Sequence, residues 1–386
     1  MNSANRRVIT KALAIAIGAL GILAVSVWTA AAQTAAPGTK SPAQGLWIRN
    51  LYFVSEFQGA ALKRTSQSAP RVTLGSANPN RHGPPPVGTL VSPRSLAFDH
   101  SGNLWVSYLE SPDNINVGSV IELTPYDLKR VASHHRVAPQ VILANQGQPY
   151  FPFFRPESIV FDTQGDLWVS DLEGRRIMKF TPDQIAQSGA PTPAVTIASS
   201  TFWVPAIHFD KSGDLWALES ADIPELYEFT PDQLQNTGSR SAAQTLELTD
   251  LRYVGDFGFD PSGNLWVPGL GSNGHGMIEM FRASDLNAAG SFVPAPAIKL
   301  TSSEFGTNWL YVPCMDGLDF DAAGDLWVAS GSSGYECPFS TFGVLEFTPS
   351  QLASGGNLRP SKVIEQKVNL SNVQFPGVIS FGPTVH

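Results

Sequence analysis

Three charged residues, Arg94, Glu157 and Asp316, occupy corresponding places in three copies of a repeated segment, and Asp256 lies one residue beyond that place in a fourth copy. We expect their side chains to meet at the mouth of a central channel. Neighbouring carboxyl groups there could bind a cation or act as an acid–base pair. The alternative is a hydrated rim in which Arg94 forms a salt bridge, because charges on a rim are common and usually inert.

The loops expected beside these charges are rich in aromatic residues, such as Trp203, Tyr253 and Trp309. Aromatic side chains gathered on one face suit an apolar, sugar or peptide ligand. The alternative is that they anchor the loops by packing on the sheets below. The candidate ligand-binding residues are Arg94, Glu157, Trp203, Asp256, Trp309 and Asp316.

Few other residues suggest chemistry. Cys314 and Cys337 fall in loops on the same face, where a disulfide would clamp the loop beside Asp316. His208 and Asp319 share one repeat position that is elsewhere small or apolar, and we interpret them as buried polar groups with satisfied hydrogen bonds. The sequence contains no Gly-x-Ser-x-Gly nucleophile motif and no Gly-rich phosphate loop.

A repeated phrase indicates which elements must position these residues. Phe-Asp-x-x-Gly-Asn/Asp-Leu-Trp occurs five times, and a sixth Leu-Trp stands at Leu46-Trp47 without its first half. The five full copies begin at Phe98, Phe161, Phe209, Phe259 and Phe320. A period near 55 residues in a chain rich in strand and turn residues is typical of a β-propeller.

Two further phrases also occur six times, one resembling Val-x-Glu-Phe-Thr-Pro and one an apolar alternation. The sequence therefore predicts an all-β, six-bladed propeller with four antiparallel strands per blade. One innermost strand remains at the C-terminus, Val378–Phe381, and we expect it to pair with Leu46-Trp47. That pairing closes the ring and hides the open sheet edges.

The repeated acids have a structural interpretation. Asp-x-x-Gly is a hairpin turn in which Asp accepts backbone hydrogen bonds and Gly takes a positive φ. A calcium loop needs more oxygen ligands than the one or two acids of each copy supply. Thr-Pro-x-Gln-Leu predicts a one-turn helix with Thr as the N-cap and Pro at the first position.

Composition excludes several classes of protein. The 386 residues carry 25 Lys and Arg against 33 Asp and Glu, a net charge of −8. Nucleic-acid binding needs clustered basic residues, so we expect no nucleic-acid partner. Two cysteines cannot build a disulfide scaffold or a four-thiolate zinc site.

The first residues are typical of a secretory leader. Basic residues precede an uncharged apolar run, Ala12 to Trp28, and Ala30-Ala31-Ala32 offers a cleavage site. We expect a signal peptide over 1–32, a linker over 33–44 and the propeller over 45–386. The protein is then secreted or periplasmic, a monomer, and without a membrane span after cleavage; an uncleaved leader acting as a membrane anchor is the alternative.

The repeats resemble those of NHL-repeat propellers and their secreted bacterial relatives, most clearly over Leu167–Phe180. Met315–Ala329 also looks like a segment of the gluconolactonase and senescence-marker family. That resemblance implies that Asp316 binds a divalent metal at the channel mouth. The phrase Gly-Asn/Asp-Leu-Trp is shared with streptogramin lyases, whose catalytic set has no counterpart that we can place on this sequence.

Three functions are compatible with this sequence. The first is an extracytoplasmic protein that binds a small molecule, a sugar, a peptide or an envelope protein on the aromatic loop face. The second is a lactonase or esterase, or a lyase, that uses Ca²⁺, Zn²⁺ or Mg²⁺ held by Asp316, Glu157 and Asp256. The third is a structural module of the envelope. A bound divalent ion would favour the second.

Overall fold

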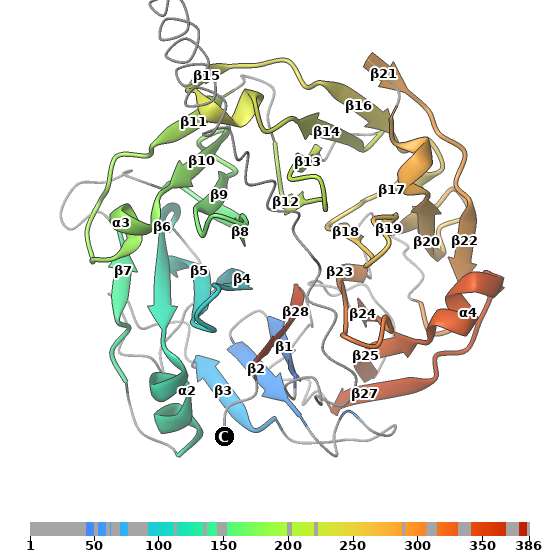
Figure 1. Ribbon diagram of the computed structural model, residues 1–386. Coiled ribbons are helices and arrows are strands. Elements are labelled where there is room, and N and C mark those ends of the chain that lie inside the picture. The colour runs from blue at the N-terminus through green and yellow to red at the C-terminus, as the bar shows by residue number, and fades with distance from the viewer. Residues whose placement is uncertain are drawn as a thin grey trace, which may run out of the picture. The chain divides into compact units, whose positions relative to one another are not determined.

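The structure is a computed structural model in which the chain from Pro42 to His386 forms one compact unit. The residues that it describes are 44–49, 53–58, 62, 70–75, 92–111, 114–133, 137–144, 153–198, 203–219, 223–287, 290–305, 315–330, 341–367 and 378–383. The leader, the linker before Gln44, Trp309, Cys314 and Cys337 lie outside them. Within this unit six sheets surround a common axis (Figure 1). The predicted six-bladed β-propeller is confirmed.

Each blade has four main antiparallel strands, which follow one another from the axis outwards. Blade 1 consists of β28 (Ile379–Pro383), β1 (Gln44–Arg49), β2 (Phe53–Phe57) and β3 (Val72–Gly75). Blade 2 consists of β4 (Pro93–Phe98), β5 (Leu104–Ser111), β6 (Asn114–Leu123) and β7 (Val141–Leu143). Blade 3 consists of β8 (Pro156–Phe161), β9 (Leu167–Asp171), β10 (Arg176–Phe180) and β11 (Val195–Ala198). Blade 4 consists of β12 (Ala206–Phe209), β13 (Leu215–Glu219), β14 (Glu225–Phe229) and β16 (Gln244–Glu247). Blade 5 consists of β17 (Leu251–Arg252) with β18 (Gly258–Phe259), then β19 (Leu265–Gly271), β20 (Gly276–Phe281) and β22 (Ile298–Thr301). Blade 6 consists of β23 (Met315–Phe320), β24 (Leu326–Ser330), β25 (Thr341–Phe347) and β27 (Lys362–Lys367).

The C-terminal strand closes the ring as predicted. β28 pairs antiparallel with β1, with Trp47 opposite Ser380 and Ile48 opposite Ile379. In Figure 1 the dark red β28 lies beside the blue β1, on the side of blade 1 that faces the axis. The first blade is therefore built from both ends of the unit.

The residues at both ends of the repeated phrase have a structural role. In blade 2, Asp99 accepts the backbone N–H groups of Ser101 and Asn103 and the indole N–H of Trp105. The turn glycines of the five copies have φ between 80° and 85°, a region that other residues rarely adopt. Each Trp ring then contacts the repeat Phe of the next blade at 5.7–6.0 Å between ring centroids, for example Trp105 on Phe161. The phrase thus carries both the turn and the contact between blades.

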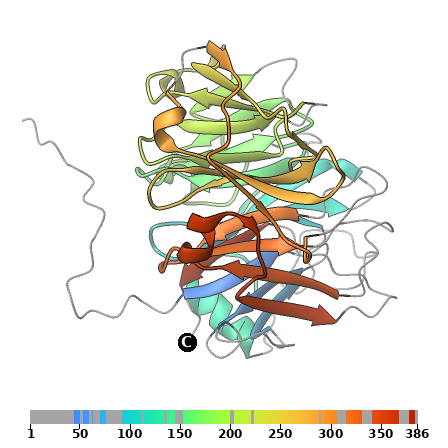
Figure 2. The same ribbon diagram turned by 90° about the vertical axis from the view of Figure 1, so that its right-hand side faces the viewer.

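The ring, turned on its side in Figure 2, has two faces. We call the face with the Asp-x-x-Gly turns and the short helices the turn face, and the face where the innermost strands β4, β8 and β23 begin the mouth face. The predicted Thr-Pro helices are α2 (Pro125–Ala132), α3 (Pro182–Ile185), η2 (Gln233–Gln235) and α4 (Pro349–Ser354), and η3 (Ala283–Asp285) replaces one in blade 5. No helix among the described residues is both long and apolar enough to cross a bilayer.

Blades 3, 4 and 5 carry a fifth outer strand that the sequence analysis missed. The strands β15 (Gly238–Ser239), β21 (Gly290–Phe292) and β26 (Gly356–Asn357) follow the short helix of one blade and pair in parallel with the outer strand of the blade before. A single parallel bridge between Leu143 and Gly189 repeats the arrangement between blades 2 and 3. Consecutive blades are therefore fastened at the rim as well as at the axis.

Candidate functional site

The central channel contains a cavity of about 330 Å³ that the innermost strands of all six blades line. In each innermost strand, one residue pairs with the tryptophan of the Leu-Trp step on the second strand of the same blade, so these six residues lie at the same level of the channel. These six residues are Ala97, Val160, His208, Gly258, Asp319 and Ser380. Four of them are small or apolar, so the chemistry of the cavity at this level depends on His208 and Asp319.

His208 forms a pair with Asp256 of the next blade. Its Nε2 lies 2.8 Å from Asp256 Oδ1, and its ring packs edge-on against Phe257 with centroids 4.9 Å apart. The His208 side chain is 33% exposed, whereas the Asp256 side chain is 5% exposed. Asp256 and His208 both line the channel cavity, so the free part of the imidazole is available to a molecule inside it.

Asp256 lies where the innermost strand of blade 5 is interrupted. The innermost strand of blade 5 is split into β17 and β18, and the chain between them leaves the ladder, beginning at Tyr253 with φ 52°. Asp256 lies in this interval and is 3% exposed. The sequence analysis placed Asp256 at the mouth, with Glu157, but the structure places it against His208 in the channel.

Asp319 joins the same cavity from blade 6. Its Oδ2 accepts the backbone N–H of Phe381 at 2.9 Å, across the closure of the ring, and its Oδ1 accepts the N–H of Phe320. Burial raises the pKa of Asp319 to about 6, although these two N–H groups and the charge of His208 act in the opposite direction. Asp319 therefore titrates close to neutrality.

The charge of His208 depends on the same carboxyl groups. Burial alone would lower the pKa of His208, but the charge and hydrogen bond of Asp256, with the charge of Asp319, outweigh it. The pKa of His208 is consequently raised above its ordinary 6.5. A carboxyl group with a pKa of about 6 and an imidazole with a raised pKa thus face one cavity, and perturbed pKa values of this kind are common in functional sites.

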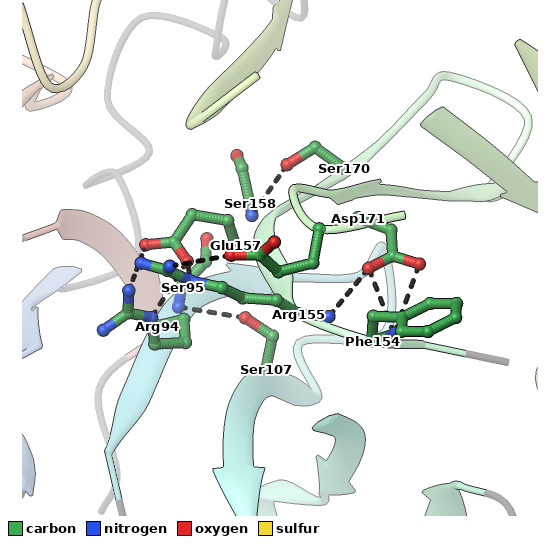
Figure 3. A network of polar contacts seen from close by, with 10 residues as sticks. Arg94, Ser95, Ser107, Phe154, Arg155, Glu157, Ser158, Ser170 and Asp171 are labelled. Carbon is green, nitrogen blue, oxygen red and sulfur yellow. Dashed lines mark hydrogen bonds and ion pairs between the residues drawn. The ribbon is translucent and has the colours of Figure 1, made fainter. Parts of the chain in front are cut away.

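The mouth has a separate network of charges (Figure 3). Arg94 contacts both oxygens of Glu157, at 2.7 Å and 3.0 Å, and Arg155 Nε lies 2.9 Å from Glu157 Oε2. Burial favours the protonated form of Glu157, but the charges of Arg94 and Arg155 outweigh it and lower the pKa of this carboxyl. The predicted salt bridge of Arg94 is thus present, with Glu157 as its partner.

The alignment that brought these residues together is supported by the strand register. Arg94, Glu157 and Asp316 are each the residue skipped by a β-bulge at the start of the innermost strand. A bulge leaves one residue without a cross-strand partner and redirects its side chain. The side chain of Asp316 lies outside the described residues, so its role as a metal ligand stays a prediction.

Arg155 and its support were missed by the sequence analysis. The buried Asp171 accepts the backbone N–H groups of Phe154 and Arg155 and holds the Arg176 guanidinium, as Figure 3 shows for the first two. Glu219 plays the same part in blade 4, where it accepts the N–H of Trp203. The sequence did contain a signal for this support, because an acid ends the second strand of both blades, Asp171 in blade 3 and Glu219 in blade 4.

The aromatic residues of the mouth face divide into two groups. Phe153 and Phe305 are each 2% exposed and pack edge-on against Phe180 and Phe347, so these two anchor loops. Trp203 is partly buried beside Glu219. The remaining aromatic residues of these loops, Trp309 among them, are mostly outside the described residues, and a ligand surface there stays a prediction.

The described residues do not fit the divalent cation implied for the mouth. Both oxygens of Glu157 contact guanidinium groups, and Asp256 contacts His208. Among the described residues, three acids surround one centre only at the turns of blades 4 and 6. We therefore derive no chemistry through a metal at the mouth.

No family model and no curated protein match this sequence. Among solved structures, a protein of unknown function from Bacteroides caccae is 11% identical, with a TM-score of 0.51 and coverage of 89% of this chain and 100% of its own. Virginiamycin B lyase from Staphylococcus aureus is 15% identical over 74% of this chain and 73% of its own, with a TM-score of 0.40. A proposed gluconolactonase is 14% identical over 72% and 78%, with a TM-score of 0.42. Only the first likeness bears on the fold, and at that identity it bears on the fold alone.

Proposed function

We propose that this protein binds a small polar molecule in its central channel, outside the cytoplasm. The observation that carries the proposal is the cavity of about 330 Å³ in which His208, Asp256 and Asp319 meet from three blades. Small-molecule sites are concave, occupy about 300–1,000 Å³ and hold a few convergent polar groups. The leader-like first residues support an extracytoplasmic location.

The charges of the cavity favour one class of ligand. Two carboxyl groups face one imidazole, and the rest of the lining contains no Asp, Glu, Lys or Arg. A ligand that donates hydrogen bonds or carries a positive charge is therefore favoured, whereas an anion would meet two carboxylates. Small amines, amino sugars and polyols are the compounds to screen.

The test is a ligand screen with paired histidine variants. We expect at least one compound of this panel to raise the melting temperature of the wild type at about 5 mM, and His208→Gln and Asp256→Asn to abolish that shift. His275→Gln is the matched control, because His275 is exposed and does not line the cavity. Binding that survives both channel variants would overturn the proposal and return attention to the aromatic loops.

A hydrolase or lyase is the second candidate, and the His208–Asp256 pair favours it. A histidine oriented by a carboxylate is a competent general base, and a buried acid with a pKa near 6 is a competent general acid. Turnover of a lactone or ester that falls about 100-fold or more in His208→Gln would establish this function. Dependence of that turnover on an added divalent ion would bring back the metal predicted at Asp316.

A further inference from the structure

The channel cavity has a polar level and an aromatic level. His208 and Asp319 define the polar level, with Asp256 in contact with His208. The next residue of each innermost strand is the Phe of the repeated phrase, which pairs with the Leu of the Leu-Trp step and so lies one residue closer to the turn face. Five of these aromatic side chains line the cavity and are partly exposed, namely Phe98, Phe161, Phe209, Phe259 and Phe320. A molecule in the cavity therefore meets acids at one level and aromatic rings at the next.

The blades hold these five phenylalanines in place. Each packs against the repeat Trp of the preceding blade, with ring centroids 5.7–6.0 Å apart. Beyond them, His100 in the turn after Phe98 is the one polar side chain that the described part of the lining adds. The aromatic level is thus a preformed apolar surface. It disfavours a ligand that carries hydroxyl groups along its length, because these would lose their hydrogen bonds to water there.

Asp319 has no basic partner within the described part of the chain. Its two oxygens each accept one backbone N–H, from Phe320 and Phe381, and no described Lys, Arg or His side chain forms an ion pair with it. Asp256, by contrast, contacts His208 at 2.8 Å. When His208 is protonated and both acids are ionised, one negative charge is left over. A carboxylate held away from bulk water without a counter-charge favours a ligand that brings one.

We propose that the ligand of the channel is an amine with one positive charge and an apolar tail, the class of the linear alkylamines. Its ammonium group contacts Asp319 at the polar level, and its tail lies among the repeat phenylalanines. The single charge of such a ligand equals the negative charge left over in the cavity, and aromatic rings near an ammonium add a cation–π attraction. This inference rests on the proposed function and narrows its ligand class, because it places alkylamines above amino sugars and polyols.

A series of short amines tests the tail. Isothermal titration calorimetry of the full-length protein with ethylamine, propylamine and butylamine should show an affinity that rises about fourfold with each added methylene. Aminopropanol is the matched control ligand, because it has the size and the ammonium group of butylamine with a hydroxyl in place of the methyl. We expect it to bind about tenfold or more weakly than butylamine, since its hydroxyl enters the aromatic level.

Asp319→Asn tests the ammonium contact. It should weaken propylamine and butylamine by the same factor, about tenfold or more, and leave the gain per methylene unchanged, because the carboxylate contacts only the charged end. Asp183→Asn is the matched control variant and should bind as the wild type does, since Asp183 is exposed on α3 and does not line the cavity. If Asp319→Asn does not fold, the wild type gives the same test, because butylamine should bind more tightly than both butanol and butyrate.

The outcomes separate this inference from the proposed function. An affinity that does not change along the amine series, or aminopropanol that binds as tightly as butylamine and is lost in His208→Gln, would overturn the apolar tail and leave a polar ligand in the channel. Butanol that binds as tightly as butylamine would overturn the ammonium contact. An amino sugar that binds when no alkylamine does would overturn this inference alone. No binding by any amine, amino sugar or polyol would overturn the proposed function with it.

Discussion

Two acid–base clusters join neighbouring blades near the axis, and they differ in which charge is in excess. At the mouth, two guanidinium groups surround Glu157 and lower its pKa. In the channel, two carboxyl groups flank His208, and the pKa values of His208 and Asp319 are both raised. Glu157 at the mouth therefore stays ionised at neutral pH, whereas in the channel the pKa of Asp319 is about 6 and the pKa of His208 is raised. This difference is why we assign structure to the first and ligand binding to the second.

The largest effect is expected at the mouth. Glu157→Gln leaves Arg94 and Arg155 close together without their shared counter-charge, so we expect the free energy of unfolding to fall by about 3 kcal/mol. Because the folded-state pKa of Glu157 is depressed, its contribution is present above the unfolded pKa of 4.5 and is lost as the pH falls further. Urea unfolding at neutral pH and at acid pH measures both effects.

The control for this variant is Glu173→Gln. Its carboxylate lies 3.5 Å from the same Arg155 but is more exposed, and we expect a loss below about 1 kcal/mol. Equal losses in the two variants would mean that the mouth cluster is an ordinary surface ion pair.

The next largest effect is expected in the channel, where the stability contributed by Asp319 depends on pH. The pKa of Asp319 is raised in the folded state, so this group makes the protein less stable as the pH rises from about 4 to about 6. The shift of about 2 pKa units corresponds to about 3 kcal/mol across that window. Asp319→Asn should flatten this part of the stability curve while keeping an acceptor for the Phe381 N–H. An unchanged slope would show that Asp319 does not titrate there.

A smaller effect is expected at His208. His208→Gln removes the contact with Asp256, and we expect a loss of about 1–2 kcal/mol at acid pH. Because the folded-state pKa of His208 is raised, this contribution is present below 6.5 and is lost as the pH rises through the folded-state value. Thermal unfolding of the variant and the wild type should therefore converge at alkaline pH. A gap that is constant with pH would assign the loss to packing on Phe257 instead.

The smallest effect sharpens the geometry of the mouth. Arg94→Lys keeps the charge but loses the two-point contact with Glu157, and we expect a loss of about 1 kcal/mol with no change in ligand binding in the channel. Differential scanning calorimetry with and without a channel ligand checks both parts. A loss of ligand binding in this variant would join the two clusters into one site.

The sequence alone predicted the blades because each repeat encodes its own turn and its contact with the next blade. Asp99 and Trp105 show this in one phrase, and the pairing of Leu46-Trp47 with Val378–Phe381 followed from counting strands. The same counting aligned Arg94, Glu157 and Asp316, and the structure finds all three at equivalent bulges. Repetition makes such positions predictable because every copy obeys the same geometry.

The contacts that define the candidate sites depend on departures from the repeat. Asp256 reaches His208 only because blade 5 interrupts its innermost strand, and no phrase in the sequence fixes where a displaced loop goes. Each turn of the repeated phrase supplies at most two acids, and the third acid of the clusters at the turns of blades 4 and 6, such as Glu228, comes from a distant strand. The rim strands did have a signal, a glycine after each short helix, such as Gly238 and Gly290, where φ is positive.

The titration of the His208 imidazole tests the central claim most directly. Histidine-labelled protein followed by NMR across pH gives the pKa of each ring, with exposed His275 as an internal reference and Asp256→Asn as the comparison. We predict a His208 pKa above 6.5 that falls in Asp256→Asn and responds when a small amine or polyol enters the channel. A His208 pKa at or below 6.5, unchanged in Asp256→Asn and by every compound of the panel, would contradict a proton-exchanging ligand site in the channel.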